Sequence, residues 1–421
     1  MVPERGSKLP DRAAERRPGC TFPGSDTSRC REHLNPSRTV IIGKLWPFAL
    51  GSVALGLDAY VIAGLLPAIA GSLKASESSV GLGVAAFTGS YAIAGPILAG
   101  RAGQRSKQSL TIALAVFMLA NVATAVAPSI VTFLAARAIA GAAAGVYSPL
   151  SSAVAAGIVE PGRQGRALSL VLSGLAVGTV FGVPTGLIIA ARWGWRATIT
   201  LIAVIGGTAL LGMGLKGGEL PSVPASGPAE RWRSIARRGN LLTIMVTLLT
   251  AVASLGLYTY LTVVLGESDL VGNQTVAIWV WGIGGAIGAL SIGPLIDRKN
   301  PLHTSLVILA VLTAALFGMT ADHTTWLMLA SLFLWGLCGW ASVAPQQHIL
   351  LAANPSDGAT AVAANASANY LGAAMGSVLG SGLIALRVSP RLLPVAACAV
   401  ALTAFLGQLA RTQMTPSPPR G

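Results

Sequence analysis

The sequence has few charged residues. Only 10% of its 421 residues are Asp, Glu, Lys or Arg, against about 25% in a typical soluble domain. Hydrophobic residues make up 53% of the chain, and a soluble protein of this length would need more polar surface to cover its core. The shortage of charge therefore excludes an ordinary soluble protein and indicates a chain that crosses a membrane several times.

Residues that bind metals or form disulfides are also scarce. Of the four cysteines, Cys20 and Cys30 lie in a polar N-terminal stretch, Cys338 and Cys398 lie in apolar runs, and the four histidines are scattered. Neither residue type has the spacing of a zinc site or a disulfide framework. No Gly-x-x-x-x-Gly-Lys-Ser/Thr phosphate loop occurs either. We therefore expect no bound metal, no cofactor and no ATP hydrolysis by this chain.

The net charge of +14 is high, but it is not arranged as a nucleic-acid-binding surface. Such a surface carries a basic stripe interleaved with aromatic residues, and the sequence has none. The excess lies in the N-terminal stretch and in short alternate loops, where Lys and Arg report the orientation of membrane spans. The expected surroundings are a lipid bilayer, with no nucleic-acid partner.

Twelve apolar runs are long enough to cross a bilayer, which takes about 20 residues. Six precede a polar linker at 217–239 and six follow it. Their predicted ranges are 41–70, 80–100, 108–127, 130–157, 166–190, 195–215, 240–265, 271–295, 302–320, 325–348, 359–386 and 390–411. The predicted fold class is an all-α polytopic membrane protein with an N-terminal half at 40–216 and a C-terminal half at 240–411.

Positive charge on alternate loops sets the predicted orientation. The richer side carries Arg101, Arg105, Lys107, Arg163, Arg166, Lys216, Arg231, Arg233, Arg237, Arg238, Arg298 and Lys299. The positive-inside rule makes that side cytoplasmic. Because the number of spans is even, both termini are then cytoplasmic, and the chain is a multi-pass protein of the cell membrane.

The two ends of the chain are polar. Residues 1–39 lack the apolar core of a signal peptide. We interpret them as a disordered cytoplasmic tail or as a stretch upstream of the true start, and residues 412–421 as a short C-terminal tail.

The two halves echo one another at a shift of 198 residues. Gly174, Gly178 and Gly182 recur every fourth position in the fifth predicted span, and Gly372, Gly376 and Gly380 repeat that spacing in the eleventh. Two six-helix halves in parallel repeat are a known transporter architecture, with the substrate site between them near the midplane.

One carboxylate, Asp58, interrupts the apolar run "LGLDAYVIAGLLPAIA" at 55–70. A charge near the middle of a membrane helix costs roughly 2.5–3.5 kcal/mol on insertion-based scales, so such residues are functional by default. Burial between helices favours the neutral form of a carboxyl group, which allows it to load and release a proton. We predict that Asp58 couples protons to transport or contacts the substrate; the alternative is a structural carboxyl that bonds to neighbouring helices.

Arg137 is an arginine inside the fourth predicted span. An arginine does not deprotonate in proteins, so it must find an acceptor or water. Two interpretations stay open. Arg137 either influences or relays the protonation state of Asp58, or it braces helices by bonding to carbonyls. Nothing in the sequence places the two side chains in contact.

Several motifs together resemble the major facilitator superfamily, within its twelve-span drug:proton antiporter branch and its bacterial sugar- and chloramphenicol-efflux-like members. "LDAYVIAGLLPAI" places Asp58 and Pro67 on the acidic and proline positions of that pattern. "RAIAGAAAG" resembles the motif built on an intramembrane arginine, and "GLAVGTVFGVPTG" resembles the antiporter motif. The resemblance implies gating or motif roles for Gly141, Gly145, Gly178, Gly182, Pro184 and Gly186.

The loop after the second span departs from the family pattern. "PILAGRAGQR" keeps Arg101, Gly103 and Arg105 but has Gly100 at the usual acidic position. The corresponding loop of the second half, "GPLIDRK", retains an acid as Asp297 beside Arg298. We therefore expect any charge latch between loop and helix to depend on the second half.

The fifth span combines its glycines with a proline. Glycines at this spacing let helix backbones approach closely. Pro184 lacks a donor and disturbs the carbonyl of Val180, which favours a bend. Plain helix packing explains the same glycines, and the resemblance is what adds a role in gating.

Polar and aromatic residues inside spans are candidates for the substrate site. Trp and Tyr near span ends also occur as interfacial belt residues, whereas an amide without a partner in lipid is costly. The predicted substrate-binding residues are Tyr91, Tyr147, Tyr258, Trp281, Gln346, Asn365 and Asn369. A similar but weaker case is Asn121.

The predicted function is proton-coupled secondary transport, as an efflux antiporter for a small amphipathic compound such as a drug, antibiotic or sugar-like metabolite. The partners are then protons and a small-molecule substrate, and we expect a monomer. A sugar or nucleoside symporter or uniporter is the alternative. A membrane enzyme or sensor would need a catalytic cluster or a soluble domain, which the sequence lacks.

Overall fold

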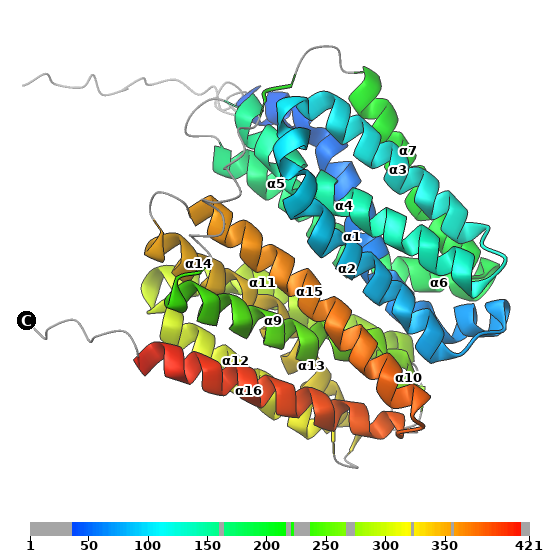
Figure 1. The fold of residues 1–421 in the computed structure, drawn as a ribbon, viewed down its shortest axis with the longest axis vertical. Helices are drawn as coiled ribbons and strands as arrows, with labels where there is room; N and C mark the ends of the chain where they lie inside the picture. Colours follow the sequence, from blue (N-terminus) through cyan, green and yellow to red (C-terminus); the bar gives the residue numbers. More distant parts are fainter. Residues whose placement is uncertain are drawn as a thin grey trace, which may run out of the picture. The chain divides into compact units, whose positions relative to one another are not determined.

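The computed structural model describes residues 36–159, 164–215, 220–222, 236–266, 274–320, 324–354 and 358–413. All regular secondary structure in these ranges is helical (Figure 1). Most of the predicted N-terminal tail and linker, and the predicted C-terminal tail from residue 414, lie outside the described residues. The first helix begins at Pro36, within the predicted tail.

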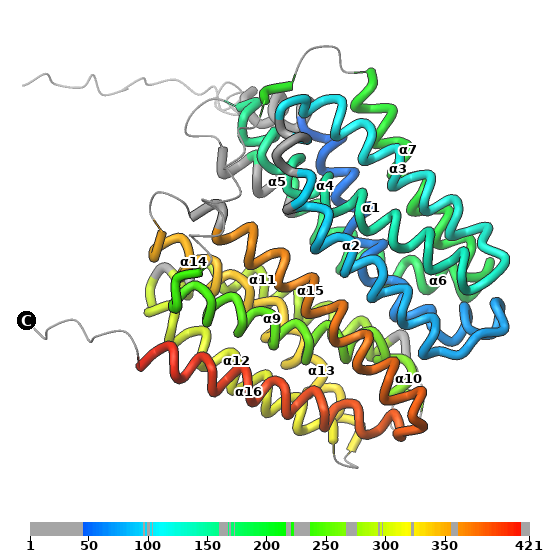
Figure 2. The backbone as a smooth tube through the Cα atoms, in the orientation of Figure 1, coloured from blue at the N-terminus to red at the C-terminus, as the bar shows by residue number. Residues whose placement is uncertain are grey.

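The helices follow the predicted spans in order, and Figure 2 traces the same course from blue to red. The N-terminal half contains α1 (Pro36–Leu73), α2 (Glu77–Gln104), α3 (Ser106–Ala125), α4 (Ile130–Ile158), α5 (Gln164–Val177), α6 (Val183–Trp193) and α7 (Trp195–Leu215). The C-terminal half contains α9 (Arg238–Thr259), α10 (Leu261–Gly266), α11 (Gln274–Arg298), α12 (Pro301–Gly318), α13 (Thr325–Ala341), α14 (Val343–Ala353), α15 (Gly358–Ala385) and α16 (Leu393–Gln413), with a short 3₁₀ turn at Pro390–Leu392.

Corresponding helices pack together in the two halves. In the first half α2 packs on α4 and α3 packs on α7, and in the second half α11 packs on α13 and α12 packs on α16. Between the halves, α2 packs along α15. The repeat detected in the sequence is therefore a repeat of helix packing.

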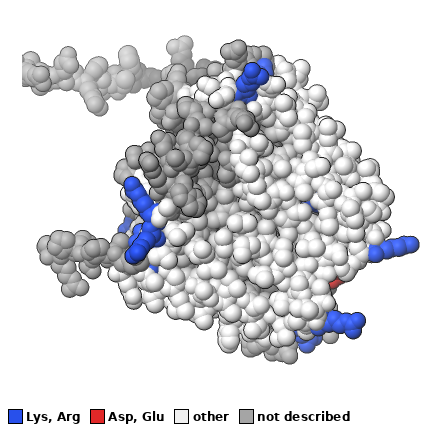
Figure 3. All heavy atoms as spheres, viewed as in Figure 1, with Lys and Arg blue, Asp and Glu red and all other residues white. Residues whose placement is uncertain are grey.

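Most of these helices suit a bilayer. Ten spans in the described residues are long and apolar enough to cross it. α2 and α15 have 28 residues each and fall outside that set; they carry many Gly, Ser and Ala residues and meet each other between the halves. Large apolar side chains are exposed elsewhere, including Leu215 at 86%, Leu290 at 82% and Trp326 at 81%. Exposure on this scale is expected of a surface that faces lipid, and Figure 3 shows a face that is almost free of charge except at its margins.

Three predicted spans are interrupted helices. The fifth consists of α5 and α6 joined by a π-helical segment at Gly178–Gly182, which ends two residues before Pro184. A π-bulge accommodates a proline that cannot donate its hydrogen bond, which is the physical form of the disturbance predicted from Pro184. The seventh span breaks at Tyr260 and the tenth at Ser342, and the sequence prediction had drawn both as continuous.

The predicted glycines lie at close helix crossings. A Cβ atom at Gly174 would overlap the carbonyl of Ala49, and one at Gly178 the carbonyl of Val53. In the second half, Gly372 meets the carbonyl of Leu248 and Gly376 that of Val252. We call these two sets the glycine ladders. Because each ladder fits the first helix of its own half, the packing interpretation of these glycines is confirmed.

Candidate functional site

Asp58 and Arg137 form a buried ion pair between α1 and α4. The Arg137 Nη1 donates to Asp58 Oδ1 at 2.5 Å, and its Nη2 donates to the Asp58 carbonyl at 3.3 Å. The side chains are 0% and 1% exposed. The structure thus brings together the two charged residues that the sequence placed inside spans.

Two neutral side chains complete the surroundings of this pair. Asn121 on α3 donates its Nδ2 to Asp58 Oδ2 and to the carbonyl of Phe117, both at 3.1 Å. The ring of Phe87 on α2 lies 4.4 Å from the guanidinium carbon of Arg137, within the range of a cation–π contact. Four helices of the N-terminal half therefore meet at this ion pair.

Small residues of α4 determine where Arg137 lies. A Cβ atom at Gly141 would overlap the carbonyl of Phe87, and one at Gly145 that of Tyr91. Because these glycines allow α4 to lie directly on α2, Arg137, one turn earlier on the same face, reaches over Phe87. The motif on which the resemblance depended is therefore a device for close packing beside the ion pair.

The chemistry open to this pair is limited. Arginine stays protonated, so Asp58 is the member that can gain or lose a proton. Burying two charges costs more desolvation than a surface pair does, and such pairs are weak contributors to stability. A buried pair in a membrane-spanning core is accordingly better explained by function than by stability.

A cluster of aromatic rings joins the two halves. Tyr60 of α1 lies 5.8 Å from Tyr258 of α9, 6.4 Å from Trp281 of α11 and 5.6 Å from Trp340 of α13, measured between ring centroids. Trp281 stacks on Tyr258 at 4.1 Å and meets Trp335 edge-on at 6.0 Å. We call these five residues the aromatic cluster. Its Trp281 Nε1 is buried without a hydrogen-bond acceptor, so it could donate to a ligand.

A second aromatic contact between the halves lies on α2 and α15. Tyr91 stacks on Tyr370 with the ring centroids 3.6 Å apart. Of the predicted substrate residues, the structure thus places Tyr91, Tyr258 and Trp281 between the halves. Sequence reasoning singled out neither Tyr60 nor Trp340, although Tyr60 lies only two residues from Asp58.

The other predicted substrate residues lie elsewhere. Tyr147 donates to the carbonyl of Phe48 at 3.2 Å within the first half. Gln346 bonds to Ser305 at 2.7 Å and to Gln408 at 3.2 Å within the second. Asn365 is fully buried without a partner, and Asn369 is half-buried one turn later. Asn365 and Asn369 share the helix face that leads into the second glycine ladder, toward α9.

The remaining motif residues are placed only in part. The surroundings of Arg101, Gly103 and Asp297 are not described, while Arg105 and Arg298 are exposed. The carbonyl of Gly186 accepts a hydrogen bond from Thr198 Oγ1 at 2.6 Å, which ties α6 to α7. The latch predicted from Asp297 stays a prediction.

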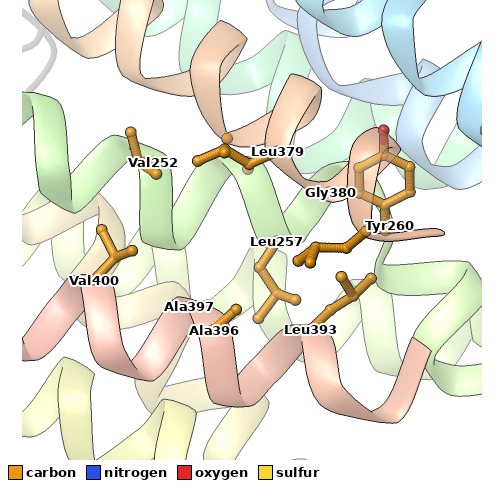
Figure 4. Close-up of a pocket in the computed structure, with 12 residues that line it drawn as sticks. Val252, Leu257, Tyr260, Leu379, Gly380, Leu393, Ala396, Ala397 and Val400 are labelled. Atoms are coloured by element: carbon orange, nitrogen blue, oxygen red, sulfur yellow. The ribbon is translucent and has the colours of Figure 1, made fainter. Parts of the chain in front are cut away.

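At one end of the spans, the halves are hydrogen-bonded to each other. Thr262 donates to the carbonyl of Ala63 and Ser381 to the carbonyl of Ser78, both at 3.0 Å. The Tyr260 ring lies against Gly81, where a Cβ atom would overlap it. The two halves are therefore in direct contact at that end of the spans. A separate apolar groove of about 50 Å³ lies between α9, α15 and α16 (Figure 4), away from the ion pair.

Two repeated helical halves, a buried ion pair in one of them and an aromatic cluster between them define a membrane transport protein. The chain belongs to the Major Facilitator Superfamily, whose sequence profile matches residues 48–377.

Known relatives agree with this family. The MFS-type transporter YtbD of Bacillus subtilis (strain 168) is 30% identical over 351 residues, covering 80% of this chain and 88% of that protein. A chloramphenicol resistance protein of Streptomyces lividans is 29% identical over 262 residues, covering 61% of this chain and 67% of that protein. The crystal structure of a D-xylose-proton symporter shares the fold, with a TM-score of 0.73 at 16% identity over 89% of this chain and 98% of the other. The chain is thus a transporter and not an enzyme.

Proposed function

We propose that this protein is a proton-coupled antiporter of the drug:proton branch that exports a small amphipathic compound. The observation that carries the proposal is the Asp58–Arg137 pair, buried inside membrane-spanning helices. In this proposal Asp58 takes up a proton from outside and releases it to the cytoplasm. The proton gradient supplies the drive, and no bound cofactor is needed.

The ion pair gives protonation a structural consequence. When Asp58 is neutral, the electrostatic attraction between α1 and α4 is lost, while Arg137 keeps its contacts with the Asp58 carbonyl and the Phe87 ring. Those two contacts do not depend on the proton. Protonation therefore weakens the ion pair, while the guanidinium keeps interaction partners. Such a change is readily reversed when the proton leaves.

The aromatic cluster is the proposed substrate site. Asp58 and Tyr60 are two positions apart on α1, so they point about 200° apart around the helix. Asp58 faces the first half and Tyr60 faces the second. A movement of α1 would thus change both the ion pair and the aromatic cluster. The rings supply stacking surface for an amphipathic ligand, and the relationship to a chloramphenicol resistance protein supports efflux of such a compound.

In this proposal the protein lies in the plasma membrane, with both termini on the cytoplasmic side. With that orientation, the contacts of Thr262 and Ser381 across the halves lie at the outer end. The described conformation is then closed to the outside. It corresponds to the state in which the substrate would enter from the cytoplasm or the inner leaflet.

The test uses everted membrane vesicles with a respiration-driven pH gradient, monitored by a pH-sensitive dye. Antibiotics, sugars and nucleosides are added to vesicles that contain the wild type or Asp58→Asn. We expect at least one amphipathic compound to discharge the gradient through the wild type and not through the variant.

An equal response from both proteins would remove Asp58 as the proton carrier. Uptake of a labelled sugar or nucleoside into intact cells, driven inward by the gradient, would replace antiport by symport.

A further inference from the structure

Asn121 has an unusual hydrogen-bonding balance. Its side chain is fully buried. The nitrogen lies 3.1 Å from two acceptors, Asp58 Oδ2 and the carbonyl of Phe117, while its oxygen Oδ1 has no partner. Because both neighbours are acceptors, the atom that faces them must be the nitrogen. An unmade bond to a buried polar atom costs about 1–3 kcal/mol, so the orphaned oxygen calls for an explanation.

The two oxygens of Asp58 are not equivalent. Oδ1 faces Arg137 Nη1. The guanidinium is always protonated and can only donate, so a proton on Oδ1 would have no acceptor. Oδ2 faces Asn121. A proton on Asp58 would therefore be carried by Oδ2 and would point at the Asn121 nitrogen, which cannot accept it.

We infer that Asn121 is a positioning residue with two amide orientations, which allow Asp58 to remain buried both as a carboxylate and as a carboxylic acid. With the carboxylate, the nitrogen donates to Oδ2, as in the structure. With the acid, the amide rotates by about half a turn, so that Oδ1 accepts the proton of Oδ2. The inference rests on the proposed function, because it concerns the proton that Asp58 is proposed to carry.

Rotation exchanges one set of bonds for another. It gives the orphaned oxygen a partner and gives up the bond to the Phe117 carbonyl. The observed orientation makes two bonds through the nitrogen, whereas the rotated one makes a single bond to the proton on Oδ2 and turns the nitrogen away from both acceptors. The rotated orientation is therefore favoured only while Asp58 is protonated. The orientation of the amide therefore follows the protonation state of Asp58. Two side chains face the Asp58 carboxyl: Asn121 from α3 and Arg137 from α4, with Phe87 of α2 behind the guanidinium. In the described residues no other titratable side chain bonds to this carboxyl.

The test measures the protonation of Asp58 directly, on purified full-length protein without substrate. Infrared difference spectra between high and low pH give the band of a protonated carboxyl, and its loss in Asp58→Asn assigns it. The pH midpoint of that band is then compared among wild type, Asn121→Leu, Asn121→Asp and Thr124→Val.

Thr124 is the matched control. It is fully buried on the same helix, and its side-chain hydroxyl donates to the carbonyl of Ala120 at 2.8 Å. We expect its substitution to leave the midpoint unchanged. Asn121→Leu removes a donor to the carboxylate, and charge-assisted bonds are the stronger ones, so the acid form gains and the midpoint should rise by about one pH unit.

Asn121→Asp is close in size and keeps the experiment decisive if the leucine variant does not fold. Two adjoining carboxyls do not ionise together easily, so the midpoint should rise further. In the wild type with isotope-labelled asparagine, the Asn121 carbonyl band should shift with the same midpoint and should be constant in Asp58→Asn.

The outcomes separate this inference from the proposed function. A midpoint that is the same in wild type and both Asn121 variants would overturn the inference and leave the function standing. Absence of any Asp58 band would overturn both. A shifted midpoint together with a failure of every compound to discharge the vesicle gradient would support the role of Asn121 and remove the antiport proposal.

Discussion

The two halves share a framework and differ in what it encloses. In the first half, α4 meets α1 through the Asp58–Arg137 ion pair. In the second, the corresponding helices α13 and α9 meet through a neutral hydrogen bond, in which Trp335 Nε1 donates to Ser254 Oγ at 2.8 Å. The glycine ladders that set the helix spacing are present in both halves. A duplicated scaffold therefore carries charge on one side only.

This difference separates two tasks. Protonation can change the first half, because its contact depends on charge, whereas the Trp335–Ser254 bond does not depend on pH near neutrality. The second half instead supplies four of the five rings of the aromatic cluster, and Tyr60 is the contribution of the first. The comparison assigns the proton to one half and most of the substrate surface to the other, with α1 in contact with both.

The largest effect is expected from Arg137→Leu. It leaves the Asp58 carboxylate buried without a counter-charge, which costs about 3–5 kcal/mol unless the carboxylate takes up a proton. We expect proton exchange in everted vesicles to fall at least about tenfold. The melting temperature in detergent should fall at high pH, where Asp58 is a carboxylate. Full exchange by this variant would show that the halves do not differ in the way proposed.

The second effect tests what the halves share. Gly178→Leu and Gly376→Leu each place a side chain against a carbonyl of the neighbouring helix, and overpacking of this kind typically costs about 1–3 kcal/mol. Both variants should lower the melting temperature and the yield of monodisperse protein by similar amounts. Gly382→Leu is the control, because a Cβ atom there meets nothing within 4 Å. A loss confined to one ladder would break the equivalence of the frameworks.

A smaller effect is expected from Tyr60→Ala. The variant removes the ring by which the first half enters the aromatic cluster, and each aromatic pair is worth about 0.5–1.5 kcal/mol. Once a compound is found, its apparent affinity in the vesicle assay should fall by about tenfold, while the pH midpoint of the Asp58 infrared band stays constant. A changed midpoint would mean that the two tasks are not separate.

The smallest effect is expected from Trp335→Phe. It keeps an aromatic ring, although a smaller one, and removes the indole donor to Ser254, a loss of about 0.5–1.5 kcal/mol for a single neutral hydrogen bond. The melting temperature should fall slightly, and proton exchange should be close to that of the wild type. If the variant lost exchange as Arg137→Leu does, the neutral contact of the second half would be as essential as the charged one.

Much of the fold follows from local features of the sequence. Long apolar runs locate the spans, and the repeated glycines predicted the ladders because a residue without a side chain is needed wherever two backbones touch. The effect of Pro184 was foreseeable for the same reason, since a missing donor acts on its own helix. The breaks at Tyr260 and Ser342 have no comparably strong local signal and were missed.

The site was harder to predict. Asp58 and Arg137 could be named because charge is rare in a span, but 79 residues separate them. Tyr147 and Gln346 matched the same polar and aromatic criteria as Tyr91 and Trp281, yet their side-chain hydrogen bonds remain within one half. From the sequence, Asn121 was a weaker candidate, because a single amide is an ordinary residue until its neighbour is known to be Asp58.

The sequence by itself determined that this chain spans a membrane in two repeated halves, and that one carboxylate and one arginine lie within the apolar part of the first half. Only the tertiary structure decided that these charges meet, that Asn121 joins them and that Tyr60 crosses to the other half. The reason is physical: a helix that is apolar on all sides can face lipid or protein in any rotation. Its partners are therefore set by the close packing of its neighbours and not by its own pattern.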